Sequence, residues 1–234
     1  MHSWHLTPEQ ALLLQKKMAG RVIQQDQPGR VTRVAGVDVC VRNDTAIAAV
    51  VVLSRPDRCV LETATAERRV TFPYVPGLLS FREGPVILDA LSRLAVKPDL
   101  AFFDGQGVAH PRRFGLASHM GLLTGLPTIG CAKSRLCGRY DTLGLTKGSV
   151  AYLRDKGEII GAAVRTRRHV KPLFISVGHR ISLSKSIRYV LEGCTEFRLP
   201  ETIRCAHRLA GGVSGGLNPK PTAPDPGNIF GRAY

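Results

Sequence analysis

Two aspartates in apolar surroundings are the first sign that this sequence carries chemistry. Asp38 lies inside the run VAGVDV at 34–39, and Asp104 directly follows LAFF at 100–103. Both runs resemble buried β-strands, where an unpaired carboxylate loses several kcal/mol of solvation. Either aspartate alone is explained as well by a turn cap or an arginine partner, whereas the two together favour a shared cation.

Glu83 adds a third carboxylate. It lies in SFREGP at 80–85, where a helix is predicted to begin, and taken alone it would be a first-turn acid stabilised by the helix dipole. Its occurrence with Asp38 and Asp104 favours a metal site over three unrelated structural roles.

The elements that must position these residues begin with a helix and three strands. TPEQ at 7–10 is a capping box with a first-turn proline, and it opens an amphipathic helix. Strand-like runs at 31–41, 47–53 and 59–71, separated by turn residues, predict an antiparallel meander. The run 47–53 is wholly apolar, so both faces of that strand should be covered.

Helices and strands then alternate. We expect a helix at 81–94, a strand at 100–104, a helix at 116–124, strands at 128–132, 159–165 and 173–177, and a helix at 184–191. This order predicts an α/β protein with Asp104 at the carboxyl end of a parallel strand, where open sheets place their sites.

Length and composition predict one domain at 1–210, followed by a Gly/Pro-rich, disordered tail at 211–234. The formal charge of +15 makes nucleic acid the first candidate partner. No run approaches the about 18 apolar residues of a membrane helix, so we expect a soluble, cytoplasmic protein without a membrane partner. We also expect a monomer. The six scattered cysteines lack zinc-site spacing.

Two short motifs mislead. GVSGG at 212–216 matches a hydrolase pattern but lies in the tail, where no strand and helix can flank its serine. GQG at 105–107 follows a strand, yet the third glycine of a dinucleotide fingerprint is absent.

Several longer motifs together resemble the endonuclease V family. They are PYVPGLLSFRE at 73–83, DGQG at 104–107, HPRRFGLASH at 110–119, PTIGCAK at 127–133, LCG at 136–138, PLFISVGHR at 172–180 and RLPETIR at 198–204. The resemblance covers nearly everything from the first helix to about Leu209. It implies a ribonuclease-H-like mixed sheet with helices on both faces.

The resemblance also implies an activity. The enzyme would recognise inosine, which is deaminated adenine, in DNA and hydrolyse the second phosphodiester bond on its 3′ side. The products would carry 3′-hydroxyl and 5′-phosphate ends, and the role would be DNA repair. Two alternatives stay open: a ribonuclease acting mainly on inosine-containing RNA, and a module that binds inosine without cleaving.

Catalytic roles follow from the same resemblance. Asp38, Glu83 and Asp104 match the carboxylates that hold a metal, and their hard oxygen ligands suit Mg²⁺, with Mn²⁺ able to substitute. Lys133 matches a lysine near the scissile phosphate, and His207 a supporting residue near the metal. Read without the resemblance, Lys133 is surface charge and His207 a solvated helix histidine.

Substrate contacts are implied as well. The strand-separating wedge would be the loop of Pro73, Tyr74, Val75 and Pro76, and the base-binding residues would be Gly77, Gly105, Gly107, His110 and Leu136. On composition alone the loop is an ordinary proline-rich turn and the glycines are tight turns. Basic residues at 112, 113, 165, 167, 168 and 171 are predicted to contact phosphates.

Overall fold

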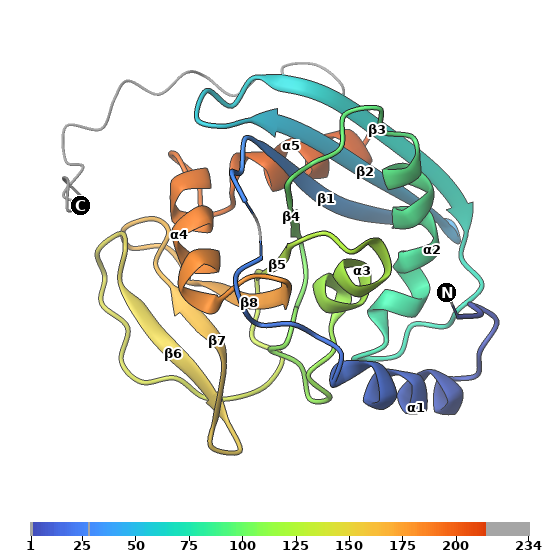
Figure 1. Cartoon of the computed structure of the whole chain (residues 1–234), viewed down its shortest axis with the longest axis horizontal. Helices are drawn as coiled ribbons and strands as arrows, with labels where there is room; N and C mark the ends of the chain where they lie inside the picture. Colours follow the sequence, from blue (N-terminus) through green and yellow to red (C-terminus); the bar gives the residue numbers. More distant parts are fainter. Residues whose placement is uncertain (1, 28, 214–234) are drawn as a thin grey trace.

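A mixed eight-stranded sheet organises the computed structural model, which describes residues 2–27 and 29–213 (Figure 1). Its strand order is β3-β2-β1-β4-β5-β8-β7-β6. The strands are β1 (Arg33–Arg42), β2 (Thr45–Ser54), β3 (Val60–Arg69), β4 (Leu100–Phe103), β5 (Thr128–Ala132), β6 (Val150–Asp155), β7 (Glu158–Val164) and β8 (Leu173–His179). The predicted tail lies outside the described residues from position 214 onward.

The sheet combines a meander with a parallel centre. As predicted, β1, β2 and β3 pair antiparallel, and the turn between β1 and β2 uses Asn43 and Asp44, both at positive φ. Strands β1, β4 and β5 are parallel, and β8, β7 and β6 continue antiparallel. The parallel centre places the carboxyl end of β4 beside Val37 in the middle of β1.

Helices cover both faces of the sheet, as expected. They are α1 (Pro8–Ala19), α2 (Leu79–Ser92), α3 (Leu116–Thr124), α4 (Leu183–Gly193) and α5 (Glu201–Ala210). Residues of α2 and α3 pack with Val37 and Phe103, whereas residues of α4 and α5 pack with Val34 and Phe102. Successive side chains of a strand point to opposite faces, so the alternation along β1 and β4 assigns each helix pair to one face.

Strand β2 is buried on both faces. All its residues from Ala48 to Leu53 are at most 1% exposed. Figure 1 shows α2 and α5 on opposite sides of this part of the sheet. This double cover explains why the run 47–53 is continuously apolar rather than alternating.

Strand β6 was not predicted, although its sequence carries a signal. VAYLRD alternates exposed and buried residues, and Lys156 and Gly157, both at positive φ, form a two-residue hairpin turn into β7. Lys-Gly is a less familiar turn pair than Asn-Gly, but it meets the same backbone requirement.

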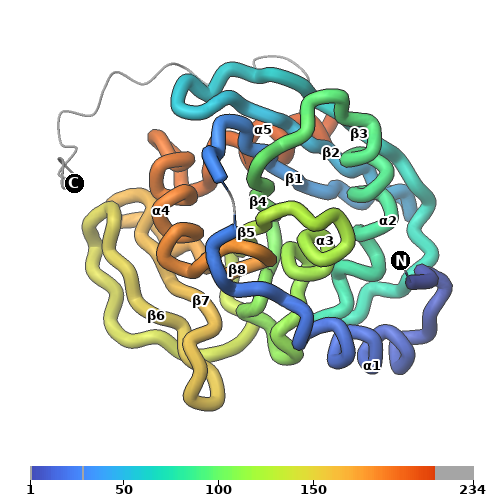
Figure 2. Tube along the Cα trace, viewed as in Figure 1, coloured from blue at the N-terminus to red at the C-terminus, as the bar shows by residue number. Residues whose placement is uncertain are grey.

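The segment before α1 turns back toward α2 (Figure 2), and its His2 and Trp4 rings contact Phe81 on α2. The predicted capping box of α1 is present, with Thr7 and Gln10 bonding reciprocally. His2 and Trp4 contact the buried ring of His119 on α3. Within the described residues, no helix combines the length and apolar character needed to cross a membrane.

Candidate active site

Asp38 and Asp104 meet because β1 and β4 are parallel neighbours. Val37 is in register with Phe103, and the amide of Asp104 donates to the carbonyl of Val37 at 3.2 Å. The two aspartates therefore follow corresponding positions on adjacent strands. Burial raises the pKa of Asp38, and the nearby charge of Asp104 raises it further, while His207 and Lys133 oppose the shift.

Glu83 approaches this pair from α2. It is the fifth residue of the helix, so its interpretation as a first-turn acid is wrong. Burial raises the pKa of Glu83 to about 8, with Asp38 and Asp104 as the next contributions. Ionising a carboxyl group that is buried beside two other carboxylates costs free energy, and a cation between them would offset that cost.

His207 reaches Asp38 from α5. Its Nδ1 lies 2.6 Å from Oδ2 of Asp38. The helix can come this close because Gly36 has no side chain: a Cβ there would lie 2.1 Å from the backbone carbon of Thr202. Gly36 therefore sets the distance between the α5 backbone and β1, and with it the position of His207.

Lys133 forms an ion pair with Asp104 from the end of β5. Strand β5 lies beside β4 with Phe103 opposite Gly130, so Lys133 lies two residues beyond the position level with Asp104. The side chain of Lys133 is 43% exposed and that of Asp104 is 12% exposed. The ammonium group is thus open to a ligand that approaches from solvent.

The donor set suits a hard divalent cation. Ligand atoms of Asp38, Asp104 and His207 all lie within 4.8 Å of one another. Glu83 is not in that group, but its pKa responds to both aspartates. Oxygen-rich sites of this kind favour Mg²⁺ or Mn²⁺, whereas structural zinc sites use cysteine and histidine.

A cavity of about 360 Å³ opens beside Asp104 and Lys133. Its lining includes most of the predicted wedge and base-binding residues: Tyr74, Val75, Pro76, Gly77, Gly105, His110 and Leu136. Ser80, Gln106 and Ser134 add polar groups to the wall. The structure therefore brings the wedge loop, the base-binding candidates and part of the carboxylate site to one opening.

Gly107 and Pro73 do not line this cavity. The amide of Gly107 donates to the hydroxyl of Ser176 at 2.8 Å, and a Cβ on Gly107 would lie 2.0 Å from the carbonyl oxygen of Val177. Close packing against β8 is thus a sufficient reason for glycine at this position.

The carbonyl of Gly77 is held by three donors. It accepts hydrogen bonds of 2.9 Å from Gln15 Nε2, His110 Nε2 and Arg112 Nη2. Gln15 was not predicted as a site residue, yet it is wholly buried on α1 and also accepts from Arg112 Nε at 2.5 Å. Gly77 itself has φ +80°, a conformation that favours glycine.

His110 is neutral and its proton position is fixed. Burial lowers the pKa of His110 to about 4, with the charge of Arg112 as the second cause. Its Nδ1 accepts from the amide of Arg112, so Nε2 carries the proton that it donates to Gly77. Both ring nitrogens are used within the protein, and His110 can contact a ligand in the cavity only through other atoms of its ring.

Arg112 and Arg113 are not the free phosphate contacts that the sequence predicted. Arg112 points inward to Gln15 and Gly77. Arg113 forms ion pairs with Asp155 at 3.0 Å and with Glu158 at 2.8 Å. Sequence alone gave no sign of these partners, because each lies more than 30 residues away along the chain.

Comparisons of sequence and of structure with known proteins match the same family. The family model described as Endonuclease V matches residues 16–208. Endonuclease V of Trichormus variabilis is 53% identical over 212 residues, which are 89% of this chain and 96% of that protein. The crystal structure of Endonuclease V from Streptomyces avermitilis has a TM-score of 0.84 at 47% identity, covering 89% of this chain and 93% of that one.

A third relative was solved with nucleic acid. Endonuclease V of Ciona intestinalis, in complex with a 23mer DNA containing an inosine followed by a ribo-adenosine, has a TM-score of 0.78 at 28% identity. The match covers 88% of this chain and 98% of that chain.

Proposed function

Because this chain belongs to the endonuclease V family, we propose that it is a metal-dependent endonuclease that recognises inosine in DNA. It hydrolyses the second phosphodiester bond on the 3′ side of the inosine and leaves 3′-hydroxyl and 5′-phosphate ends, in the repair of deaminated adenine. The observation that carries this proposal is the cavity beside Asp104 and Lys133, which offers room for a flipped base next to the carboxylates.

Asp38, Glu83 and Asp104 would hold the metal, with His207 fixing the carboxylate of Asp38. A bound Mg²⁺ or Mn²⁺ supplies an activated water and stabilises the leaving oxygen. Lys133 places a positive charge at the same edge, where it can offset the negative charge that grows on the phosphate during displacement.

Base recognition would use the cavity wall. Hypoxanthine carries an oxygen where adenine carries an amine, and it lacks the exocyclic amine of guanine, so a tight polar wall can select it. Gly77 and Gly105 let the backbone approach the ring closely, and the ring of His110 and the side chain of Leu136 provide contact surface. Tyr74, 72% exposed, would wedge into the helix and replace the flipped base in the stack.

The decisive test is cleavage of a labelled deoxyinosine oligonucleotide without metal, with Mg²⁺ and with Mn²⁺. Asp104→Ala should lower cleavage by more than the about 100-fold typical of outer-shell metal partners, while lesion binding is retained. The exposed Asp57→Ala, which removes the same charge away from the cavity, is the matched control. Unchanged cleavage by Asp104→Ala would sink the assignment.

The same assay decides between the alternatives. Product mapping must place the cut at the second bond 3′ of inosine. A matched inosine oligoribonucleotide compares RNA with DNA, a comparison prompted by the ribo-adenosine in the Ciona complex. Binding without scission under every metal condition would leave only a non-cleaving inosine module.

A further inference from the structure

A second hollow lies next to the active site, and the functions assigned so far do not use it. Arg135, Tyr140, Arg165 and Phe174 line it, with Asp141 as its acidic residue. It is formed by the segment after β5 together with the facing ends of β7 and β8.

This hollow and the lesion cavity share one wall. The short segment 132–136, which starts with the last residue of β5, contributes Ala132, Lys133, Ser134 and Leu136 to the lesion cavity. The intervening Arg135 lines the second hollow instead. Phe174 is the register partner of Ala132 on β8, so it too adjoins this wall. A nucleic-acid strand that passes Asp104 and Lys133 can therefore continue directly into the second hollow.

The hollow opens on the sheet face opposite to α4. Leu173 and Ile175 pack into the cluster that contains α4 residues, whereas Phe174 packs with Ala132 and Ala163 in a different cluster. Neighbouring residues on a strand point to opposite faces, so the Phe174 side is the one that α4 leaves uncovered.

Aromatic and cationic groups converge in the hollow. The Tyr140 and Phe174 rings lie 5.8 Å apart at 64°, and the guanidinium of Arg135 lies 6.0 Å from the Tyr140 ring centre. Phe174 is 7% exposed and packs against the edge of the Tyr140 ring, while Tyr140 is partly exposed and Arg135 is exposed. An aromatic ring with an adjacent arginine is the usual platform for an unpaired base and its phosphate.

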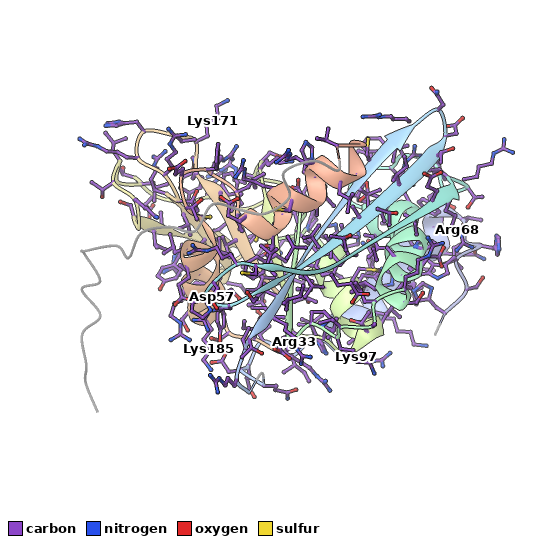
Figure 3. All side chains as sticks on the ribbon, turned by 90° about the horizontal axis from the view of Figure 1, so that it is seen from above. Arg33, Asp57, Arg68, Lys97, Lys171 and Lys185 are labelled. Atoms are coloured by element: carbon purple, nitrogen blue, oxygen red, sulfur yellow. The ribbon has the colours of Figure 1, made fainter. Side chains whose placement is uncertain are left out.

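The surroundings favour a polyanion. Exposed Arg139, Arg167, Arg168 and Lys171 lie on the loops that border the hollow's residues in sequence. Figure 3 places Lys171 on the opposite side of the molecule from Arg33 and Lys97, which mark the starts of β1 and β4. Strands β1 and β4 run from Arg33 and Lys97 toward Asp38 and Asp104. The loop that contains Lys171 therefore lies on the same side of the molecule as these two aspartates.

We propose that the Arg135–Tyr140 hollow binds a nucleotide of the cleaved strand on the 3′ side of the cut. This inference rests on the proposed function, in which the inosine lies on the 5′ side of the cut bond. The inosine occupies the lesion cavity, and the nucleic-acid strand crosses the carboxylates and Lys133. The second nucleotide after the cut stacks on Tyr140 with its phosphate near Arg135.

The test uses single-stranded deoxyinosine oligonucleotides with Mg²⁺, a fixed 5′ portion, and either one or six nucleotides after the cut. For the wild type we expect kcat/KM to be about tenfold higher on the longer substrate, the size of one stacking contact. Arg135→Gln and Tyr140→Leu should each bring the ratio of long to short substrate toward one. Arg135 is exposed, so its variant should fold even if Tyr140→Leu does not.

Arg188→Gln is the matched control. Arg188 is also an exposed arginine over a tyrosine, 5.3 Å from the Tyr189 ring centre, but it belongs to α4 on the opposite face. It should keep the wild-type ratio. A wild-type ratio near one, or an Arg135→Gln ratio equal to that of the wild type, would overturn the subsite alone. No cleavage of either substrate by the wild type would overturn the proposed function and the subsite with it.

Discussion

Tyr74 differs from the other aromatic residues around the candidate site in its exposure. It is 72% exposed, whereas Phe72 and Phe81 on either side of it in the sequence are 4% and 1% exposed. An aromatic ring in solvent, held between two prolines, contributes little to the core. The interpretation of this loop as an ordinary turn with a packed tyrosine therefore does not fit.

We expect Tyr74→Ala to reduce cleavage of deoxyinosine in a duplex more than in a single strand, because only the duplex requires a wedge. A difference of about 5- to 100-fold corresponds to one stacking contact. The measurement is the ratio of kcat/KM on the two substrates. Tyr152→Ala removes another exposed tyrosine, on β6, and should leave the ratio unchanged. Equal losses on both substrates would contradict the wedge role.

Single site residues were predictable where a charged residue stands among apolar neighbours in the sequence. Asp38 and Asp104 are charges in apolar strands, and local sequence shows this directly. Glu83 and His207 required the family resemblance, since each looks like an ordinary helix residue. Gln15 gave no signal at all, because its three partners lie 62 to 99 residues away and only the folded chain brings them together.

At the scale of elements, α5 depends on one glycine. Gly36→Ala should lower the free energy of unfolding by about 1–3 kcal/mol, the usual cost of overpacking, because the added Cβ meets the backbone of Thr202. Cleavage should fall as well, because the displaced α5 would move His207 away from Asp38. The checks are urea unfolding and the deoxyinosine assay.

Gly20→Ala is the control for that substitution. Gly20 ends α1 with φ −66°, and a Cβ there would meet nothing within 4 Å. Its stability and activity should match those of the wild type. If Gly36→Ala also behaved like the wild type, Gly36 would not set the distance between α5 and β1.

Elements were predictable from periodicity except where exposure obscured the pattern. Helices α1 to α4 were found from apolar residues at helical spacing. The meander, β4, β5, β7 and β8 were found as strand-like runs, of which β4, β5 and β8 are buried throughout. Helix α5 was not predicted as an element. Strand β6 is an edge strand whose exposed face carries Val150 and Tyr152, so apolar residues stand on both faces and the alternation of apolar and polar residues is weak. Strand order was also not readable, since it depends on contacts between distant segments.

At the scale of the whole molecule, buried histidines should make stability depend on pH. Burial lowers the pKa of His119 to about 3 and that of His110 to about 4. Both stay neutral in the folded chain, whereas the unfolded chain binds protons below about pH 6.5. Their contribution to the free energy of unfolding is fully present above pH 6.5 and decreases as the pH falls toward 4. Glu83 acts in the opposite sense, because its raised pKa favours the folded state at low pH.

The slope assigned to His119 is measurable by comparison with a variant. Between pH 6.5 and 4.5 the free energy of unfolding of the wild type should fall by about 2 kcal/mol more than that of His119→Gln. One titrating group contributes at most about 1.4 kcal/mol per pH unit. Urea unfolding at a series of pH values gives both slopes. The exposed His5→Gln serves as the control. Parallel curves for the wild type and His119→Gln would show that His119 does not stay neutral.

The triple hydrogen bond at Gly77 limits how far the chain can be shortened. Every carboxylate of the candidate site lies at or after position 38, so a fragment that begins after α1 would keep all the chemistry. It would lose Gln15, and with it one donor to the Gly77 carbonyl and the acceptor for Arg112. We therefore expect the smallest working enzyme to include α1, which carries none of the carboxylates, because Gln15 on α1 holds the loop that we propose as the wedge.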